Sequence, residues 1–157
     1  AGGTAKAIGY GIKEKGGKLT ITYNRNKQKG ENLAKELGCE LIHCRDAGTQ
    51  SIDILINCSP VGMNPNINES PFLARNFKEG MVVFDSVYNP LETKLLREAK
   101  AAGCKVIPGS ELFINQAAQQ FELFTGQPAP INAMREVLTE KLNCSGFSNT
   151  SHIEMFC

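Results

Sequence analysis

The chain has 157 residues, of which 41% are hydrophobic, so it is long enough and apolar enough to bury the core of one domain. Its formal net charge of +1 argues against nucleic acid or an anionic membrane as the main partner. No apolar run reaches transmembrane length, and the six cysteines form no CxxC pair or ligand-spaced His partner, so no metal site is expected.

The first residues, AGGTAKA, match the tail of a Gly-x-Gly-x-x-Gly/Ala fingerprint whose front edge is missing. Gly2 and Ala5 occupy its second and third small positions. Small residues let backbone N–H groups approach a pyrophosphate at the N-terminus of the following helix. The stretch therefore predicts a dinucleotide site, and a flexible glycine-rich end is the alternative.

The next strand is predicted at 18–24, KLTITYN, and the polar turn NRNKQKG follows it. In a dinucleotide fold the end of this strand meets the adenine ribose, where an acidic residue would bind the 2′-hydroxyl of NAD. This turn offers Asn24, Arg25, Lys27 and Lys29 and no acid. Cations suit a 2′-phosphate, so the turn predicts NADP, with a solvated basic turn as the alternative.

The rest of the chain alternates helices and strands. Further strands are predicted at 39–43, 52–57, 81–87 and 104–108, and helices at 26–37, 72–80, from the N-cap Asn89 to Gly103, from the cap Ser110 to Gly126, and at 131–142. Alternation predicts an α/β fold, a doubly wound parallel sheet over residues 1–142 whose first, central strand would precede Ala1. We expect residues 143–157 to be a disordered tail.

Ligands of open α/β sheets bind at the carboxyl ends of the strands. The residues that leave the predicted strands are Asn24-Arg25, Asn57-Cys58-Ser59, Asp85 to Tyr88, and Gly109. The Tyr88 hydroxyl could reach a polar substrate or satisfy a backbone group, and Asp85 could act as an acid or base or cap local backbone. Gln116 is expected to border the packed face of its helix, so its amide needs a partner in the core or on a ligand.

Five ordered motifs carry a family resemblance. They are AGGTAKA, NRNKQK, NCSPVGM, DSVYNPLETKLLREAKAAG and PGSELFINQAAQQFELFTG. Together they resemble the Rossmann-like NADP-binding domain of shikimate dehydrogenase, most of all the C-terminal part of the plant bifunctional dehydroquinate dehydratase/shikimate dehydrogenase. The resemblance extends from Ala1 to about Leu142.

The resemblance also implies ligand contacts. The pyrophosphate would be held by Ala1, Gly2, Gly3, Thr4 and Ala5, the 2′-phosphate by Asn24, Arg25, Asn26 and Lys29, and the nicotinamide end by Ser59, Met63, Ser86 and Gly109. Tyr88 and Gln116 match positions that touch shikimate in the family. Asn26 replaces a usual Thr and Lys29 a frequent Arg, and either change should weaken the grip on NADP without abolishing it.

The implied activity is the reversible NADPH-dependent reduction of 3-dehydroshikimate to shikimate. In the family the catalytic Lys and Asp belong to a substrate domain, expected upstream of Ala1, so the chain alone should be inactive. Quinate dehydrogenase and a non-catalytic NADP-binding module are the alternatives. The parent protein would lie in a plastid if the plant resemblance holds and in the cytoplasm otherwise.

Overall fold

The computed structural model describes residues 2–144, which form two compact units that meet between Gly109 and Ser110 in the sequence. The sequence, by contrast, predicts one domain over residues 1–142. The first unit contains α1 (Gly3–Glu14), β1 (Thr20–Tyr23), α2 (Lys27–Leu37), β2 (Glu40–His43), η1 (Cys44–Thr49), β3 (Ile54–Asn57), η2 (Ala74–Asn76), β4 (Val82–Asp85), α3 (Lys94–Ala101) and β5 (Lys105–Ile107). The second contains α4 (Gly109–Thr125), apart from its first residue, and α5 (Ile131–Cys144).

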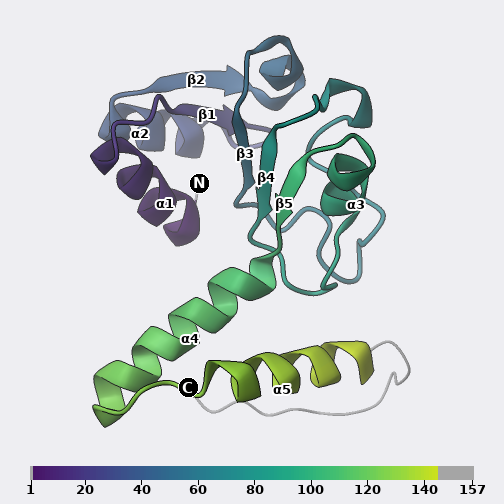
Figure 1. Cartoon of the computed structure of the whole chain (residues 1–157). Coiled ribbons are helices and arrows are strands. Elements are labelled where there is room, and N and C mark those ends of the chain that lie inside the picture. The colour runs from purple at the N-terminus through teal and green to yellow at the C-terminus, as the bar shows by residue number, and fades with distance from the viewer. Residues whose placement is uncertain (1, 145–157) are drawn as a thin grey trace. The chain divides into compact units, whose positions relative to one another are not determined.

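Every described strand pair is parallel, which confirms the predicted α/β class. Each observed strand lies inside its predicted range and is one to three residues shorter. Within residues 2–144 the strands form two sheets, β1-β2 and β3-β4-β5, rather than one continuous sheet (Figure 1). In the second sheet Asn57 is the register partner of Asp85, so the last residues of β3 and β4 are neighbours.

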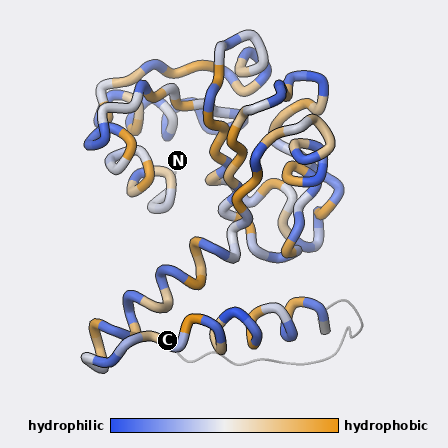
Figure 2. Tube along the Cα trace, in the orientation of Figure 1, coloured by the Kyte–Doolittle hydropathy of each residue, from blue (hydrophilic) through white to orange (hydrophobic). Residues whose placement is uncertain are grey.

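The core of the first unit lies between the β3-β4-β5 sheet and α3. Val83 and Ala99 are fully buried, and Leu95 and Leu96 are nearly so. Figure 2 shows the corresponding run of hydrophobic residues along these strands. The strands are apolar on both faces, as expected for a parallel sheet, and this packing fixes the position of their carboxyl ends.

Local capping signals set the helix ends. The Asn26 side chain accepts a hydrogen bond from the Lys29 backbone N–H at 2.9 Å, and Gly38 ends α2 with a left-handed φ of 60°, which confirms the predicted helix. The predicted start of the next helix is wrong. Thr93, not Asn89, is the N-cap of α3, because its hydroxyl accepts from the Leu96 backbone N–H at 3.3 Å. The following helix, α4, begins at Gly109, one residue before the predicted cap Ser110.

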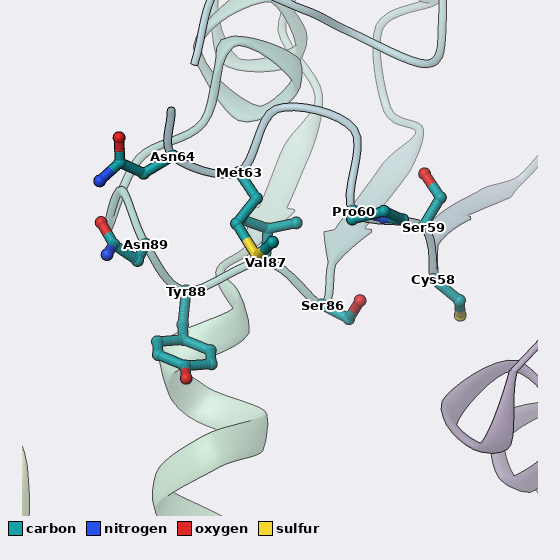
Figure 3. A pocket seen from close by; sticks show the side chains of 9 residues that line it. All are labelled: Cys58, Ser59, Pro60, Met63, Asn64, Ser86, Val87, Tyr88 and Asn89. Carbon is teal, nitrogen blue, oxygen red and sulfur yellow. The ribbon is translucent and has the colours of Figure 1, made fainter. Parts of the chain in front are cut away.

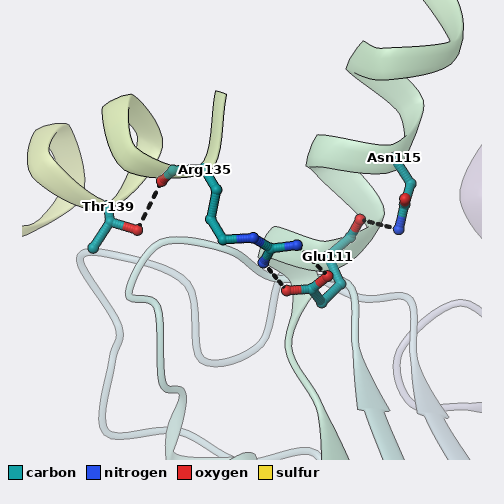
Figure 4. Close-up of polar contacts among 4 residues, drawn as sticks. All are labelled: Glu111, Asn115, Arg135 and Thr139. Atoms are coloured by element: carbon teal, nitrogen blue, oxygen red, sulfur yellow. Dashed lines mark hydrogen bonds and ion pairs between the residues drawn. The ribbon is translucent and has the colours of Figure 1, made fainter. Parts of the chain in front are cut away.

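The second unit is a pair of helices linked by an ion pair. Arg135 on α5 donates two hydrogen bonds to the carboxylate of Glu111 on α4 (Figure 4). Helix α5 runs to Cys144, so residues 143 and 144 are helical instead of part of a tail. The rest of the predicted tail, residues 145–157, lies outside the described residues. In the described part of the chain, no helix is both long and apolar enough to cross a membrane.

Candidate functional site

A pocket of about 330 Å³ lies at the carboxyl ends of β3 and β4 (Figure 3). The loop after β3 lines it with Cys58, Ser59, Pro60, Met63 and Asn64, and the loop after β4 lines it with Ser86, Val87, Tyr88 and Asn89. The two loops are joined by backbone hydrogen bonds, from Ser86 N–H to the Asn57 carbonyl at 2.9 Å and from Asn64 N–H to the Asn89 carbonyl at 3.0 Å. Parallel strands that end together therefore create the concave surface that the sequence predicts at this edge.

Buried polar side chains lie behind the pocket. Asp85 and Thr93 are completely buried and Asn57 is 5% exposed. Asp85 accepts from the Asn57 amide at 2.9 Å, the Val87 backbone N–H at 3.0 Å and the Thr93 hydroxyl at 2.6 Å. Its carboxylate therefore caps local backbone and neighbouring side chains, the second of the two roles expected for it.

Burial also sets the protonation of two groups at this edge. It raises the pKa of the Cys58 thiol to about 11, and the nearby Asp85 charge adds to the effect. Cys58 is thus a neutral thiol at physiological pH and a poor nucleophile. Burial raises the pKa of Asp85 as well, while its hydrogen bonds from Thr93, Val87 and Asn57 act in the opposite direction.

Gly109, at the start of α4, packs against the backbone of the loop after β4. A Cβ atom at this position would lie 2.4 Å from the Val87 carbonyl oxygen and 2.7 Å from the Ser86 carbonyl carbon. These neighbours are backbone atoms, so a larger residue could be accommodated only by moving the loop. Gly109 therefore packs against the backbone of Ser86 and Val87, two residues that line the pocket, but does not line it itself.

The N-terminus of α1 has no side-chain cap. Its N-cap, Gly2, provides no side-chain hydrogen bond, and no acidic residue lies in the first turn. The first N–H groups of a helix need an external acceptor, and the helix dipole favours an anion there. Gly2, Gly3, Thr4 and Ala5 occupy this end, as the fingerprint predicts, whereas Ala1 lies outside the described residues.

The N-terminus of α2 is unusually basic. Its first turn contains Lys27 and Lys29 and no acid, and Asn24 and Arg25 lie just before it, all of them exposed. Cations at the positive end of a helix are unfavourable, by roughly 0.3–1 kcal/mol each, unless an anion neutralises them. Lys27 pairs with Glu31 at 3.3 Å. The Asn26 side-chain oxygen accepts the capping hydrogen bond from the Lys29 backbone N–H.

The structure therefore groups the predicted site residues in three places. Ser59, Met63, Ser86 and Tyr88 line one pocket, the fingerprint residues begin α1, and the basic residues begin α2. Gln116 belongs to the second unit and is exposed, so the prediction that its amide is half-buried is wrong. The buried side of α4 runs through Ile114 and Ala118, and position 116 points away from it.

Thr93 is the residue that sequence reasoning missed. It connects the start of α3 to Asp85, eight residues earlier in the chain. A threonine directly before the helical run KLLREAKA is a recognisable N-cap signal, but Asn89-Pro90 offers a competing one upstream.

Comparisons with known proteins give a consistent family. The model of the shikimate 5′-dehydrogenase C-terminal domain matches residues 109–139. The bifunctional 3-dehydroquinate dehydratase/shikimate dehydrogenase, chloroplastic, of Arabidopsis thaliana is 39% identical over 143 residues, which cover 89% of this chain and 24% of that protein.

Two solved structures extend the match to the fold. Shikimate 5-dehydrogenase from Thermus thermophilus, in complex with NADP(H) and shikimate, has a TM-score of 0.78 at 33% identity and covers 88% of this chain. Quinate dehydrogenase from Corynebacterium glutamicum, in complex with NAD, has a TM-score of 0.79 at 29% identity and covers 89%. The chain spans 52% of each of these proteins. The expected resemblance is confirmed: the chain is similar to the shikimate dehydrogenases, and its residues 109–139 match the model of their C-terminal domain.

Proposed function

We propose that this chain binds NADP and forms the cofactor-binding part of an enzyme that interconverts 3-dehydroshikimate and shikimate. The start of α2 carries the cofactor assignment, since the basic and amide residues at positions 24–29 meet a helix N-terminus with no acid to receive a ribose hydroxyl. The open start of α1 suits the pyrophosphate of the same molecule. The Thermus thermophilus relative, solved with NADP(H) and shikimate, supports both ligands.

The pocket at β3 and β4 suits the nicotinamide end. Ser59, Ser86 and Met63 would contact the ring from the two loops, and the backbone at Gly109 would border it. NADP, when bound, supplies the hydride chemistry, while these residues orient the ring and exclude water. Tyr88 would donate a hydrogen bond to the substrate from the same pocket, and we propose a second substrate contact from Gln116.

The proton transferred with the hydride needs an acid–base pair. We propose that it comes from an upstream substrate domain of the parent protein, as the Lys and Asp of the family do. By the resemblance to the Arabidopsis enzyme, the parent protein could also carry a dehydratase domain and lie in a plastid. Residues 1–142 would then form the NADP-binding domain of that protein.

Quinate dehydrogenase is the second candidate function. The Corynebacterium glutamicum structure supports it, because it matches as well as the shikimate enzyme does in overall fold. That structure contains NAD, whereas the turn before α2 lacks the acid that NAD requires. The basic turn therefore favours the NADP-dependent shikimate enzyme.

The test uses the complete protein that carries this chain. It compares NADP with NAD and shikimate with quinate by absorbance of the reduced cofactor. Arg25→Asp should raise the NADP Michaelis constant about ten- to a hundredfold, since a charge-assisted bond to the 2′-phosphate becomes a repulsion.

Arg75→Asp is the matched control. Arg75 is also an exposed arginine, but it lies on η2, away from the turn, and its substitution should leave both cofactor constants unchanged. Equal kinetics with NADP and NAD in the unsubstituted protein would contradict the cofactor assignment. Faster turnover of quinate than of shikimate would favour the second candidate.

A further inference from the structure

The carboxylate of Asp85 connects three segments around the pocket without lining it. One oxygen, Oδ1, accepts from the Asn57 amide at the end of β3 and from the Val87 backbone N–H after β4. The other, Oδ2, accepts from the Thr93 hydroxyl at the start of α3. One buried group therefore fixes the two pocket loops relative to a helix that packs in the core.

The hydrogen bonds continue from this carboxylate to the pocket surface. The Asn57 oxygen accepts from both the hydroxyl of Ser59, at 2.7 Å, and its backbone N–H, at 3.0 Å, while the Asn57 amide also donates to the Val61 carbonyl at 3.3 Å. Asp85 thus orients Asn57, which in turn orients Ser59. On the other side, the bond to the Val87 N–H fixes the turn between Ser86 and Tyr88.

All three partners of Asp85 donate, which suits an ionised carboxylate, since this group only accepts. A carboxamide of the same size could accept at one oxygen only and would turn an NH₂ group toward another donor. Asp85→Asn therefore keeps the volume of the side chain and breaks part of the network.

We propose that Asp85 is a positioning residue of the site, whose carboxylate holds the two pocket loops in the arrangement that aligns cofactor and substrate. The inference rests on the proposed function, because alignment is measured through turnover. Asp85 touches neither ligand in this scheme and acts through Asn57, Val87 and Thr93. Its substitution should therefore affect alignment more than binding at the distant start of α2.

The kinetic test measures Asp85→Asn in the complete protein. We expect kcat to fall about ten- to a hundredfold and the Michaelis constant for shikimate to rise, because a small misplacement of reacting groups is costly. The dissociation constant for NADP should change less than about threefold, since the anion sites at α1 and α2 are unaffected. A loss of thermal stability with all kinetic constants unchanged would mean a merely structural role and would overturn the inference.

Asp53→Asn is the control for the chemical change. Asp53 is exposed, just before β3, and its substitution should change none of these values. The hydroxyl of Thr93 provides a rescue test. Thr93→Val removes the donor to Asp85 and should reproduce the kinetic pattern of Asp85→Asn, whereas Thr93→Ser keeps the hydroxyl and should restore values close to wild type. Equal kinetics for the valine and serine variants would count against the proposal.

Hydrogen exchange tests the positioning role of Asp85 without relying on turnover, so it can fail or succeed independently of the proposed function. In Asp85→Asn the peptides that contain residues 57–63 and 85–93 should exchange faster, while 20–43 should be unchanged. Faster exchange at both loops supports the positioning role even if the wild-type protein does not oxidise shikimate, a result that would refute the proposed function alone. Unchanged exchange at both loops would overturn the inference.

Discussion

Tyr88 is one of the residues that line the pocket, and 40% of the residue is exposed. Ser59 and Ser86, which also line the pocket, have shorter side chains than Tyr88. The Ser59 hydroxyl already donates a hydrogen bond to Asn57. We propose that Tyr88 selects a hydroxylated substrate, since a site built to hydrogen-bond a substrate loses much affinity when one partner is removed.

Tyr88→Phe should lower kcat/KM for shikimate by about ten- to a few-hundredfold, the scale of roughly 1–3 kcal/mol for a buried polar group left without its partner. NADP affinity, measured by titration calorimetry, should barely change. Tyr10→Phe makes the same chemical change on exposed helix α1, where the hydroxyl donates to Glu36, and should leave the kinetics intact. A raised dissociation constant for NADP with an unchanged Michaelis constant for shikimate in Tyr88→Phe would show that the residue serves the cofactor instead.

At the residue scale, the sequence predicts what depends on strand ends and fails where distant partners decide. Ser59, Ser86 and Tyr88 follow buried strands and do line one pocket. The role of Thr93 depends on the carboxylate of Asp85 at the end of β4, and the hydrophobic periodicity of the sequence does not reveal this contact. Gln116 was misplaced because the apolar pattern around it leaves the helix phase ambiguous, and Ile114 and Ala118 mark the face that is buried.

At the scale of elements, the strands were predictable because each is a short apolar run between polar turns. Two helix starts were not, since Asn89 and Thr93, or Ser110 and Gly109, compete as boundaries and tertiary contacts choose between them. The ion pair between α4 and α5 also escapes sequence reasoning, because Glu111 and Arg135 are 24 positions apart.

The Glu111–Arg135 pair predicts a pH dependence of the second unit. The hydrogen bonds from Arg135 lower the pKa of Glu111 below its usual value, with a smaller opposing effect of burial. A carboxyl group with a lowered folded-state pKa stabilises the fold above its unfolded pKa, and this contribution is lost as the pH falls through the folded-state value. Stability should therefore decrease as the pH drops below about 4.5.

Glu111→Gln should remove this part of the acid dependence and lower the thermal midpoint slightly at neutral pH, because the pair is partly exposed. The difference from wild type should shrink at about 1 M salt, where exposed charges are screened. Glu136→Gln, an exposed change on α5, provides the comparison. An identical acid transition in wild type and Glu111→Gln would contradict the assignment.

At the scale of the whole molecule, the first unit contains two parallel sheets where the alternation of elements predicts one. The described strands pair as β1-β2 and β3-β4-β5, so β1 and β3 each have a neighbour on one side in this part of the chain. A parallel strand between them would complete a doubly wound sheet and lead into the fingerprint at the start of α1. We propose that the parent protein supplies it before Ala1.

This proposal predicts a difference between two proteins. The 157-residue chain alone should unfold with low cooperativity, since open strand edges leave backbone groups without partners. Addition of an apolar strand that ends in Gly before Ala1 should give one sharp thermal transition, whose midpoint rises with NADP by mass action. Shikimate should still not be oxidised, since the acid–base pair is proposed to lie elsewhere. A sharp thermal transition of the unextended chain, with a midpoint that rises with NADP, would refute the proposal that a strand is missing.

The basic residues at the start of α2 lower the stability of the protein without cofactor, but they favour NADP over NAD in the proposed function. Glutamate in place of Lys29 would suit the positive end of the helix and strengthen the apoprotein, yet it would repel a phosphorylated ribose. Lys27 differs, because it already pairs with Glu31 at 3.3 Å. A laboratory selection for heat resistance without cofactor should therefore drift toward acids in this turn and erode the preference for NADP. The same selection with NADP present should keep the basic residues, because the bound cofactor stabilises the proteins that carry them.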